Sequence, residues 1–253
     1  MKFDFAQASL VGDRADNQDR AEMLIQDGVT LAILADGMGG HADGALAAET
    51  AMASLKESFR RVRKRNLDPE PFLRASLTAA HHEVLALGKG MEAQLKPGTI
   101  IVCALLIGNS MWWAHAGDSR AYHLRNGKLL ERTRDHTEVD MLLAEGKITR
   151  DEVSRHRDRH IVEYCLGVAP ADKPEVAIDD ARTLEQGDVV ILCSDGLWDQ
   201  VDETTLIGQM SSPGDLNDLL LDLVHLAAQT FSPHSDNVTA IAIRASGSGR
   251  KTA

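Results

Sequence analysis

One stretch decides both the fold and the site: the sequence LAILADGMGGH at residues 31–41, an apolar run of strand length that leads into a carboxylate and a glycine-rich turn. A run this apolar is typical of a strand buried on both faces, so we expect Asp36 where a core strand ends. The glycines would let backbone carbonyls approach a ligand closely. Taken alone, the pattern is more simply an ordinary Asp-Gly turn.

The pattern recurs, which favours a site over a turn. The apolar run at 111–117 leads into Asp118, the run at 189–194 leads into Asp195, and Asp236 comes just before the strand pattern at 238–243. Two carboxylates 4 Å apart repel by about 4 kcal/mol at an effective dielectric near 20. Their pKa values must therefore separate, or a cation must lie between them. Oxygen ligands without thiolates or clustered imidazoles favour Mg²⁺ or Mn²⁺ over zinc.

Composition excludes several classes of protein. The chain has 253 residues, with 27 basic residues against 38 acidic ones and a net charge of −11, which argues against a nucleic-acid or anionic-membrane partner. Three widely spaced cysteines imply no disulfide framework. No apolar run is long enough to span a bilayer, and the N-terminus lacks the apolar segment of a signal peptide. We therefore expect a cytoplasmic protein.

Periodicity along the chain predicts an α+β fold. Antiparallel hairpins and helices grouped in blocks are typical of a layered sandwich rather than of a βαβ fold. Residues 132–167 form a polar insertion, interpreted as a flap, that contains a short helix at 139–145, a capping box at 149–152 and a cationic patch of Arg155, His156, Arg157, Arg159 and His160. Strands are predicted at 21–26, 29–35, 99–107, 111–116, 120–124, 128–131, 175–181, 188–194 and 238–244, and helices over 45–59, 73–87 and 216–226.

The order of short motifs resembles the metal-dependent protein phosphatases of type 2C, the bacterial members most closely. The motifs are RADNQD at 14–19, DGMGGH at 36–41, GT at 98–99, GDSR at 117–120, DHT at 135–137, SDGLWD at 194–199 and DNVT at 236–239. Each tetrapeptide alone is weak evidence, but the whole series in this order is specific. The resemblance implies two stacked antiparallel β-sheets between helical layers, with the flap as the variable insertion.

The resemblance also implies roles for individual residues. Asp36 would bridge two Mn²⁺ or Mg²⁺ ions, with the carbonyl of Gly37 completing the first site; Asp195 and Asp236 would hold the second ion. Asp19 would order metal-bound water, Asp118 with Asp195 would form a weaker third site, and Arg14 would grip the substrate phosphate. A guanidinium suits that last role because it can bind two oxygens at once.

One position departs from the pattern of many eukaryotic members, which have a histidine directly after the Asp-Gly of the second motif. This chain has Met38 there, as bacterial relatives often do, so the proton donor is unassigned. His41 is nearby, and we interpret it as structural rather than catalytic.

The predicted protein is a phosphatase domain over residues 1–245 with a disordered tail at 246–253. It would be a protein-serine/threonine phosphatase, in which a hydroxide activated between two ions attacks phosphorus. Its substrates would be phosphorylated proteins, the targets of a cognate Ser/Thr kinase, and it is expected to be a monomer. Two alternatives are a bimetal phosphoesterase acting on diesters or small phosphomonoesters, and an inactive phosphate-binding module of the same fold.

Overall fold

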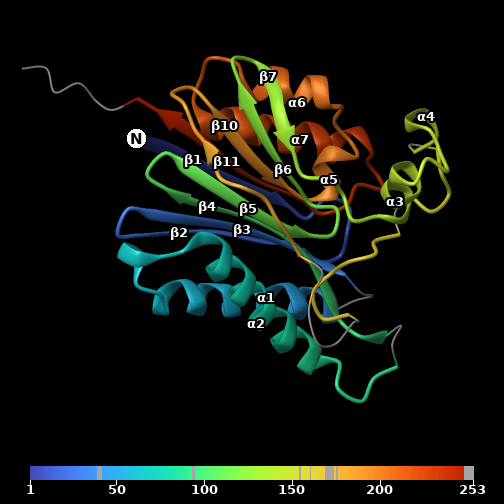
Figure 1. Cartoon of the computed structure of the whole chain (residues 1–253). Coiled ribbons are helices and arrows are strands. Elements are labelled where there is room, and N and C mark those ends of the chain that lie inside the picture. Colours follow the sequence, from blue (N-terminus) through green and yellow to red (C-terminus); the bar gives the residue numbers. More distant parts are fainter. Residues whose placement is uncertain are drawn as a thin grey trace, which may run out of the picture.

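Two antiparallel sheets stacked face to face form the centre of the computed structural model, and helices cover both outer faces (Figure 1). The structure describes residues 1–38, 42–92, 95–153, 155–159, 161–168, 174 and 176–247. Within these residues, one sheet has the strand order β1-β11-β10-β6-β7 and the other has the order β2-β3-β4-β5-β8, with β9 also paired to β5. The predicted α+β sandwich is confirmed.

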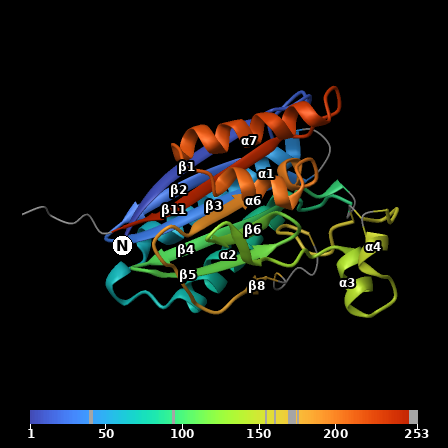
Figure 2. The same cartoon turned by 90° about the horizontal axis from the view of Figure 1, so that it is seen from above.

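The first sheet contains β1 (Lys2–Leu10), β6 (Arg120–Arg125), β7 (Lys128–Arg132), β10 (Val189–Cys193) and β11 (Val238–Ser246). The second contains β2 (Arg20–Gln26), β3 (Val29–Met38), β4 (Gly98–Ile107), β5 (Ser110–Ala116), β8 (Ala177–Ile178) and β9 (Arg182–Thr183). The helices are α1 (Ala42–Arg61), η1 (Lys64–Asn66), α2 (Pro69–Leu87), α3 (Glu138–Ala144), α4 (Arg150–Val153), α5 (Asp195–Trp198), α6 (Glu203–Met210) and α7 (Leu216–Thr230). Figure 2 shows α7 lying along the sheet that contains β1 and β11.

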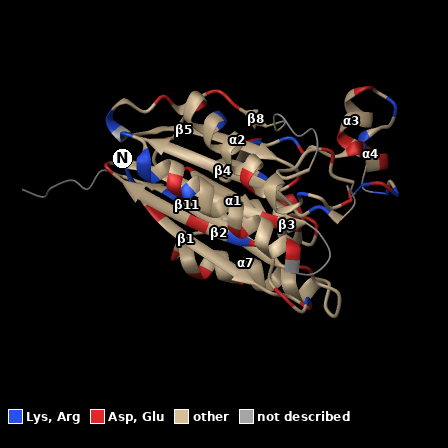
Figure 3. Cartoon of the chain, turned by 90° about the horizontal axis from the view of Figure 1, so that it is seen from below, with Lys and Arg blue, Asp and Glu red and all other residues tan. Residues whose placement is uncertain are grey.

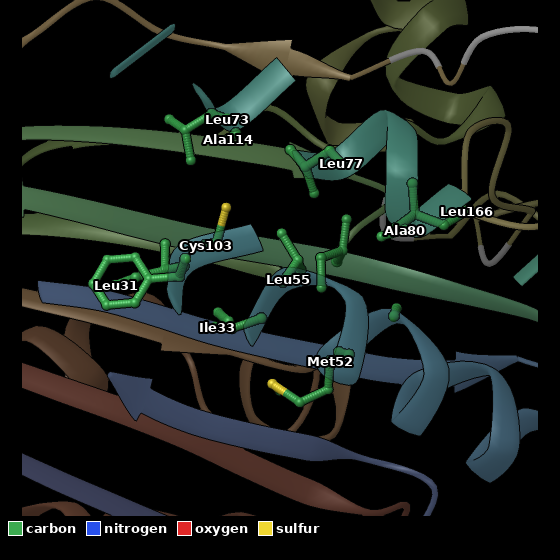
Figure 4. Packing of buried hydrophobic residues seen from close by; sticks show 14 of the residues in the cluster. Leu31, Ile33, Met52, Leu55, Leu73, Leu77, Ala80, Cys103, Ala114 and Leu166 are labelled. Carbon is green, nitrogen blue, oxygen red and sulfur yellow. The ribbon is translucent and has the colours of Figure 1, made fainter. Parts of the chain in front are cut away.

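Strand β3 is buried on both faces, as its apolar sequence predicts. Leu31 and Ile33 pack with residues of α1 and α2 in one core cluster, part of which Figure 4 shows. Ala32 and Leu34 point the other way, into the cluster between the two sheets. Each fully buried leucine or isoleucine stabilises the fold by about 1.5–3 kcal/mol. This two-sided packing fixes the end of β3, and with it Asp36.

Turn and capping residues form two of the hairpins and the start of helix α2. Asp27 and Gly28 both have positive φ (52° and 77°), and so do Asn126 and Gly127 (52° and 72°), as a tight type I′ hairpin requires. Helix α2 begins after its N-cap residue, Asp68, with proline in its first turn. None of the helices that the structure describes is long and apolar enough to cross a membrane.

The structure corrects the predicted extent of several elements. β3 continues through Asp36 to Met38, which pairs with Gly98. Asp36 therefore lies within the paired part of the strand, near its end, rather than after it. β11 continues to Ser246, which pairs with Lys2, because the unpredicted strand β1 offers it a partner. The predicted disordered tail therefore starts too early, and residues 248–253 lie outside the described residues.

Two further predictions were incomplete. The strand predicted at 175–181 is reduced to the two-residue β8, since the carboxylate of Asp179 turns to the indole of Trp113 and aspartate is disfavoured within strands. The short β9, at Arg182–Thr183, follows that range and was not predicted. Residue 175 lies outside the described residues. Helix α6 was not predicted, although Asp202 caps it by accepting a hydrogen bond from the Thr205 amide at 3.0 Å.

The flap stands beside one end of the sheets and carries α3 and α4 (Figure 1). An isolated bridge between Thr99 of β4 and Leu166 joins it to the body, and a second bridge, between Thr137 and Val162, ties two parts of the flap together. Figure 3 shows acidic as well as basic segments around α3 and α4. In the predicted cationic patch, Arg157 pairs with Asp158 at 3.0 Å. The patch is therefore less uniformly positive than its sequence indicates; His160 lies outside the described residues.

Candidate active site

A cleft of about 520 Å³ opens where the ends of β3, β10 and β11 meet the segment that follows β5. Each strand contributes an acidic residue at or near its end, as the recurring sequence pattern predicts. The lining includes six of the seven predicted site residues: Arg14, Asp36, Gly37, Asp118, Asp195 and Asp236.

Asp36 is held by the strand ladder. It pairs with Ile100 on β4, and the hydroxyl of Thr99 donates to its backbone carbonyl at 2.8 Å. Burial raises the pKa of Asp36 well above its usual range, and the charges of neighbouring acids, with that of Asp19 the largest, raise it further. The carboxylate is therefore in an environment that opposes its charge unless a cation is close.

Asp118 is 3% exposed, and its Oδ1 atom has no hydrogen-bond partner among the residues described. Burial, followed by the charge of Asp195, raises its pKa to about 7. Its backbone carbonyl accepts a hydrogen bond from the indole of Trp198 at 2.9 Å. The guanidinium of Arg120 lies 3.5 Å from the centre of the Trp198 ring, so the β6 and α5 elements together fix the position of Asp118.

The glycine before Asp118 is required by the backbone. Gly117 has φ +109°, and a Cβ there would lie 2.6 Å from two side-chain carbons of Ile100. Gly37 is also tightly placed, since a Cβ on it would lie 2.3 Å from the carbonyl oxygen of Gly44. At both positions a Cβ would collide with a neighbouring residue, so glycine allows the backbone to pass close to that neighbour beside the cleft.

Asp19 lies behind the wall of the cleft rather than in its lining. The carboxylate is 5% exposed and accepts a hydrogen bond from the Ser194 hydroxyl at 2.9 Å. That hydroxyl in turn accepts from the Thr239 amide at 3.1 Å. Burial raises the pKa of Asp19 to about 7 despite these hydrogen bonds. Burial and the charge of Asp236 likewise raise the pKa of Asp195 to about 6.

Arg14 reaches the cleft from the loop after β1. Its guanidinium is paired with the carboxylate of Asp236 at 2.6 Å, with 60% of the Arg14 side chain exposed. The loop is anchored by Asn237, whose side-chain amide donates to the carbonyl of Val11 at 2.8 Å and accepts from the Gln18 amide at 2.8 Å. Two segments more than 200 residues apart in sequence are thereby brought together.

The potential metal ligands of the cleft suit a hard divalent cation. They are carboxylates and a backbone carbonyl, all oxygen ligands, and the orphaned Oδ1 of Asp118 is a buried acceptor that a cation would satisfy. Among the described residues no three His, Cys, Asp or Glu side chains already surround one point as an ion site. Asp236 is instead paired with Arg14, and the charges of the neighbouring acids raise the pKa of Asp36; a bound cation would oppose both effects.

Sequence reasoning missed the residues that hold this site. Asn237 and Ser194 are adjacent to predicted ligands in the chain, yet their positioning roles depend on contacts more than 170 residues away. Their place inside the Asp-Asn and Ser-Asp motifs is the sequence signal that could have found them. Met38, which stands where many eukaryotic members have a histidine, lines the cleft, whereas Gly39, Gly40 and His41 lie outside the described residues.

The fold and this acid-lined cleft define a type 2C phosphatase architecture, and comparisons with known proteins agree. The family model described as Protein phosphatase 2C matches residues 8–141. The chain belongs to the protein phosphatase 2C family.

Among individual relatives, the serine/threonine protein phosphatase PstP of Mycobacterium tuberculosis is 35% identical over 234 residues, which are 90% of this chain but 42% of that protein. The chain thus spans less than half the length of that relative. The protein phosphatase PhpP of Streptococcus pneumoniae is 30% identical over 229 residues, covering 89% of this chain and 90% of that one. A crystal structure of the PstP catalytic domain in complex with two manganese ions superimposes with a TM-score of 0.80 at 31% identity, over 97% of this chain and 99% of that one.

Proposed function

We propose that the cleft hydrolyses phosphoserine and phosphothreonine in proteins. The observation that carries the proposal is the convergence of Asp36, Asp118, Asp195 and Asp236 on one cleft with Arg14 at its rim. Phosphoryl transfer needs concentrated positive charge around the phosphate, and an acid cluster is the means by which a protein concentrates divalent cations. The names of the relatives, which are serine/threonine phosphatases, support the same reaction.

Two Mn²⁺ or Mg²⁺ ions are proposed to be held by Asp36, Gly37, Asp195 and Asp236, with Asp118 contributing to a weaker third site. When bound, such ions lower the pKa of water and offset negative charge on a phosphoryl group. The manganese-bound PstP structure supports a metal-dependent reaction. For Asp19 we propose an indirect role, because its carboxylate stands behind the lining and is oriented by Ser194.

Arg14 is proposed to grip the substrate phosphate. Its side chain is well exposed and forms an ion pair with Asp236, an interaction worth about 0–1 kcal/mol at a surface. A phosphate can therefore displace Asp236 from Arg14 at little cost, and this exchange would leave the carboxylate free for a cation. Binding of cation and of phosphate would each favour the other.

The substrates are proposed to be proteins phosphorylated by a cognate Ser/Thr kinase, and the protein is proposed to act as a monomer. A cytoplasmic location is supported by the cysteines: Cys103, Cys165 and Cys193 are all free, and burial raises the pKa of each thiol. Such inert, unpaired thiols are usual in a reducing compartment.

The proposal is tested by phosphate release from phosphothreonine and phosphotyrosine peptides, with Mn²⁺, with Mg²⁺ and with excess chelator. We expect release from the phosphothreonine peptide that depends on added metal. A matched control is Asp180→Asn, which removes an exposed carboxylate outside the cleft. Release that survives chelation, with metal-free protein confirmed by elemental analysis, would refute metal-dependent hydrolysis. Activity confined to small phosphomonoesters would instead favour the phosphoesterase alternative.

A further inference from the structure

A second cavity lies at the base of the flap, between α3, the loop after β7 and the outer edge of β5. Its volume is about 550 Å³, within the usual range for small-molecule sites. None of its lining residues is shared with the acid-lined cleft. It is therefore a separate cavity, and its occupant need not be the phosphatase substrate.

The floor of the cavity is aromatic. The imidazole rings of His115 and His136 are stacked, with centroids 4.4 Å apart and an interplanar angle of 28°. Tyr164 meets His136 edge-on at 5.3 Å. Met141 and Ala144 of α3 form part of the opposite wall. Flat rings and a thioether favour a planar aromatic ligand over an aliphatic one.

His115 presents an unsatisfied hydrogen-bond acceptor. Its Nε2 lies 2.7 Å from the backbone carbonyl of Arg134; because a carbonyl can only accept, Nε2 carries the hydrogen and Nδ1 is left as an acceptor. The residue is 2% exposed, and Nδ1 has no partner among the residues described. Burial lowers the pKa of His115, in keeping with this neutral tautomer. A buried acceptor without a donor is costly, so a ligand with an N–H group would be favoured.

Arg134 is the arginine of the wall whose charge can meet an acid. The four carboxylates of the lining are already paired: Asp135 with Arg120 at 2.6 Å, Glu131 with Arg182 at 2.5 Å, Glu145 with Lys147 at 2.6 Å and Asp179 with Arg182 at 3.4 Å. The second arginine of the lining, Arg132, lies 3.4 Å from Asp135 and 3.6 Å from Glu203. Arg134, in contrast, is exposed and donates to a backbone carbonyl, that of Asp140, at 2.6 Å. Its positive charge therefore remains for a negatively charged ligand group.

We propose that this cavity binds a compact planar heteroaromatic acid. The ring would lie against His136, its N–H would donate in the plane of the His115 imidazole to Nδ1, and its carboxylate would face Arg134. The amide of His136 donates to the carbonyl of Gly117 at 3.0 Å, the residue before Asp118. The ligand would thus sit close to the segment that carries one acid of the cleft.

The test is a titration of the full chain, labelled with ¹³C at the methionine methyls, with indole-3-acetate as the probe. Met141 lines the flap cavity and Met38 lines the acid-lined cleft, so the two methyls report the two sites separately. We expect a saturable shift at Met141 with none at Met38. Because the readout is binding, it does not depend on phosphatase activity.

Three comparisons examine the assigned contacts. We expect 1-methylindole-3-acetate, which lacks the N–H donor, to bind about tenfold more weakly. Arg134→Gln should weaken indole-3-acetate by roughly two- to fivefold, as expected for an exposed ion pair. Ala144→Trp, on the exposed side of the cavity wall, should abolish the Met141 shift by filling the space, whereas Ala86→Trp, an exposed substitution on α2, should leave it unchanged.

Other outcomes would overturn the proposal. They are a shift at Met38 alone, no saturable shift at Met141, equal affinity for the N-methylated probe, or full binding to the Ala144→Trp protein. His115→Phe keeps a ring while removing the acceptor, and it should reproduce the loss seen with the N-methylated probe. If that variant does not fold, the pair of probes still decides the role of the N–H donor.

Discussion

In the metal-free protein, the free energy of unfolding of the Asp118→Asn variant should increase relative to that of wild type as the pH rises. Above about pH 4 the unfolded Asp118 has lost its proton, whereas in the folded protein burial and Asp195 raise its pKa to about 7. Between these pH values the folded state binds more protons than the unfolded state. The Asp118 carboxylate of wild type therefore lowers the free energy of unfolding as the pH increases. The interval from pH 5 to pH 7 is two pH units, so wild type loses about 3 kcal/mol of unfolding free energy at 1.36 kcal/mol per unit.

Equilibrium urea denaturation in excess chelator at pH 5 and pH 8 measures this effect. Relative to wild type, Asp118→Asn should gain about 3 kcal/mol of unfolding free energy between the two pH values. Groups that Asp118 does not shift, including His136, whose pKa burial lowers to about 4, are present in both proteins and largely cancel. Loss of the Asp118 charge also removes one cause of the raised pKa of Asp36, which changes the difference in the same direction. Asp180→Asn, at an exposed position, should show little change. A constant difference for Asp118→Asn, or one of opposite sign, would refute the reasoning.

Three further outcomes follow from the site. Arg14→Lys keeps the charge but loses the two-pronged guanidinium, so KM for phosphopeptides should rise several-fold while calorimetry shows unchanged metal binding; an unaltered KM would mean that another group holds the phosphate. Asp36→Asn should abolish turnover and most of the rise in Tm that Mn²⁺ causes, and full retention of that rise would contradict its place among the ligands. Gly196→Ala should lower stability by about 2 kcal/mol or more in urea denaturation, because its Cβ would lie 2.0 Å from the Asn237 carbonyl oxygen; a stability equal to wild type would show that the backbone there can adjust.

Much of the fold could be predicted from local sequence. The apolar run ending at Asp36, the Asp27-Gly28 and Asn126-Gly127 turns and the stripes of α1 and α2 each carry their own periodicity or turn chemistry. The strands that were missed or shortened lie at sheet edges. β1 has a largely exposed face, and β8 has only two residues, so neither has the strong apolar signal of a central strand.

The acids that lie at the ends of core strands can be identified from local sequence, because an apolar run followed by aspartate is a pattern within one segment. Their arrangement around the cleft depends on the folded chain: Asp19 stands behind the cleft wall, oriented by Ser194, while Asp36 and Asp118 line it. The fold rather than a local pattern sets these positions. It also decided that Asn237 ties the Arg14 loop to the last strand. These contacts join residues more than 170 positions apart, and hydrogen bonds over such separations are set by how the two sheets stack, which no local pattern encodes.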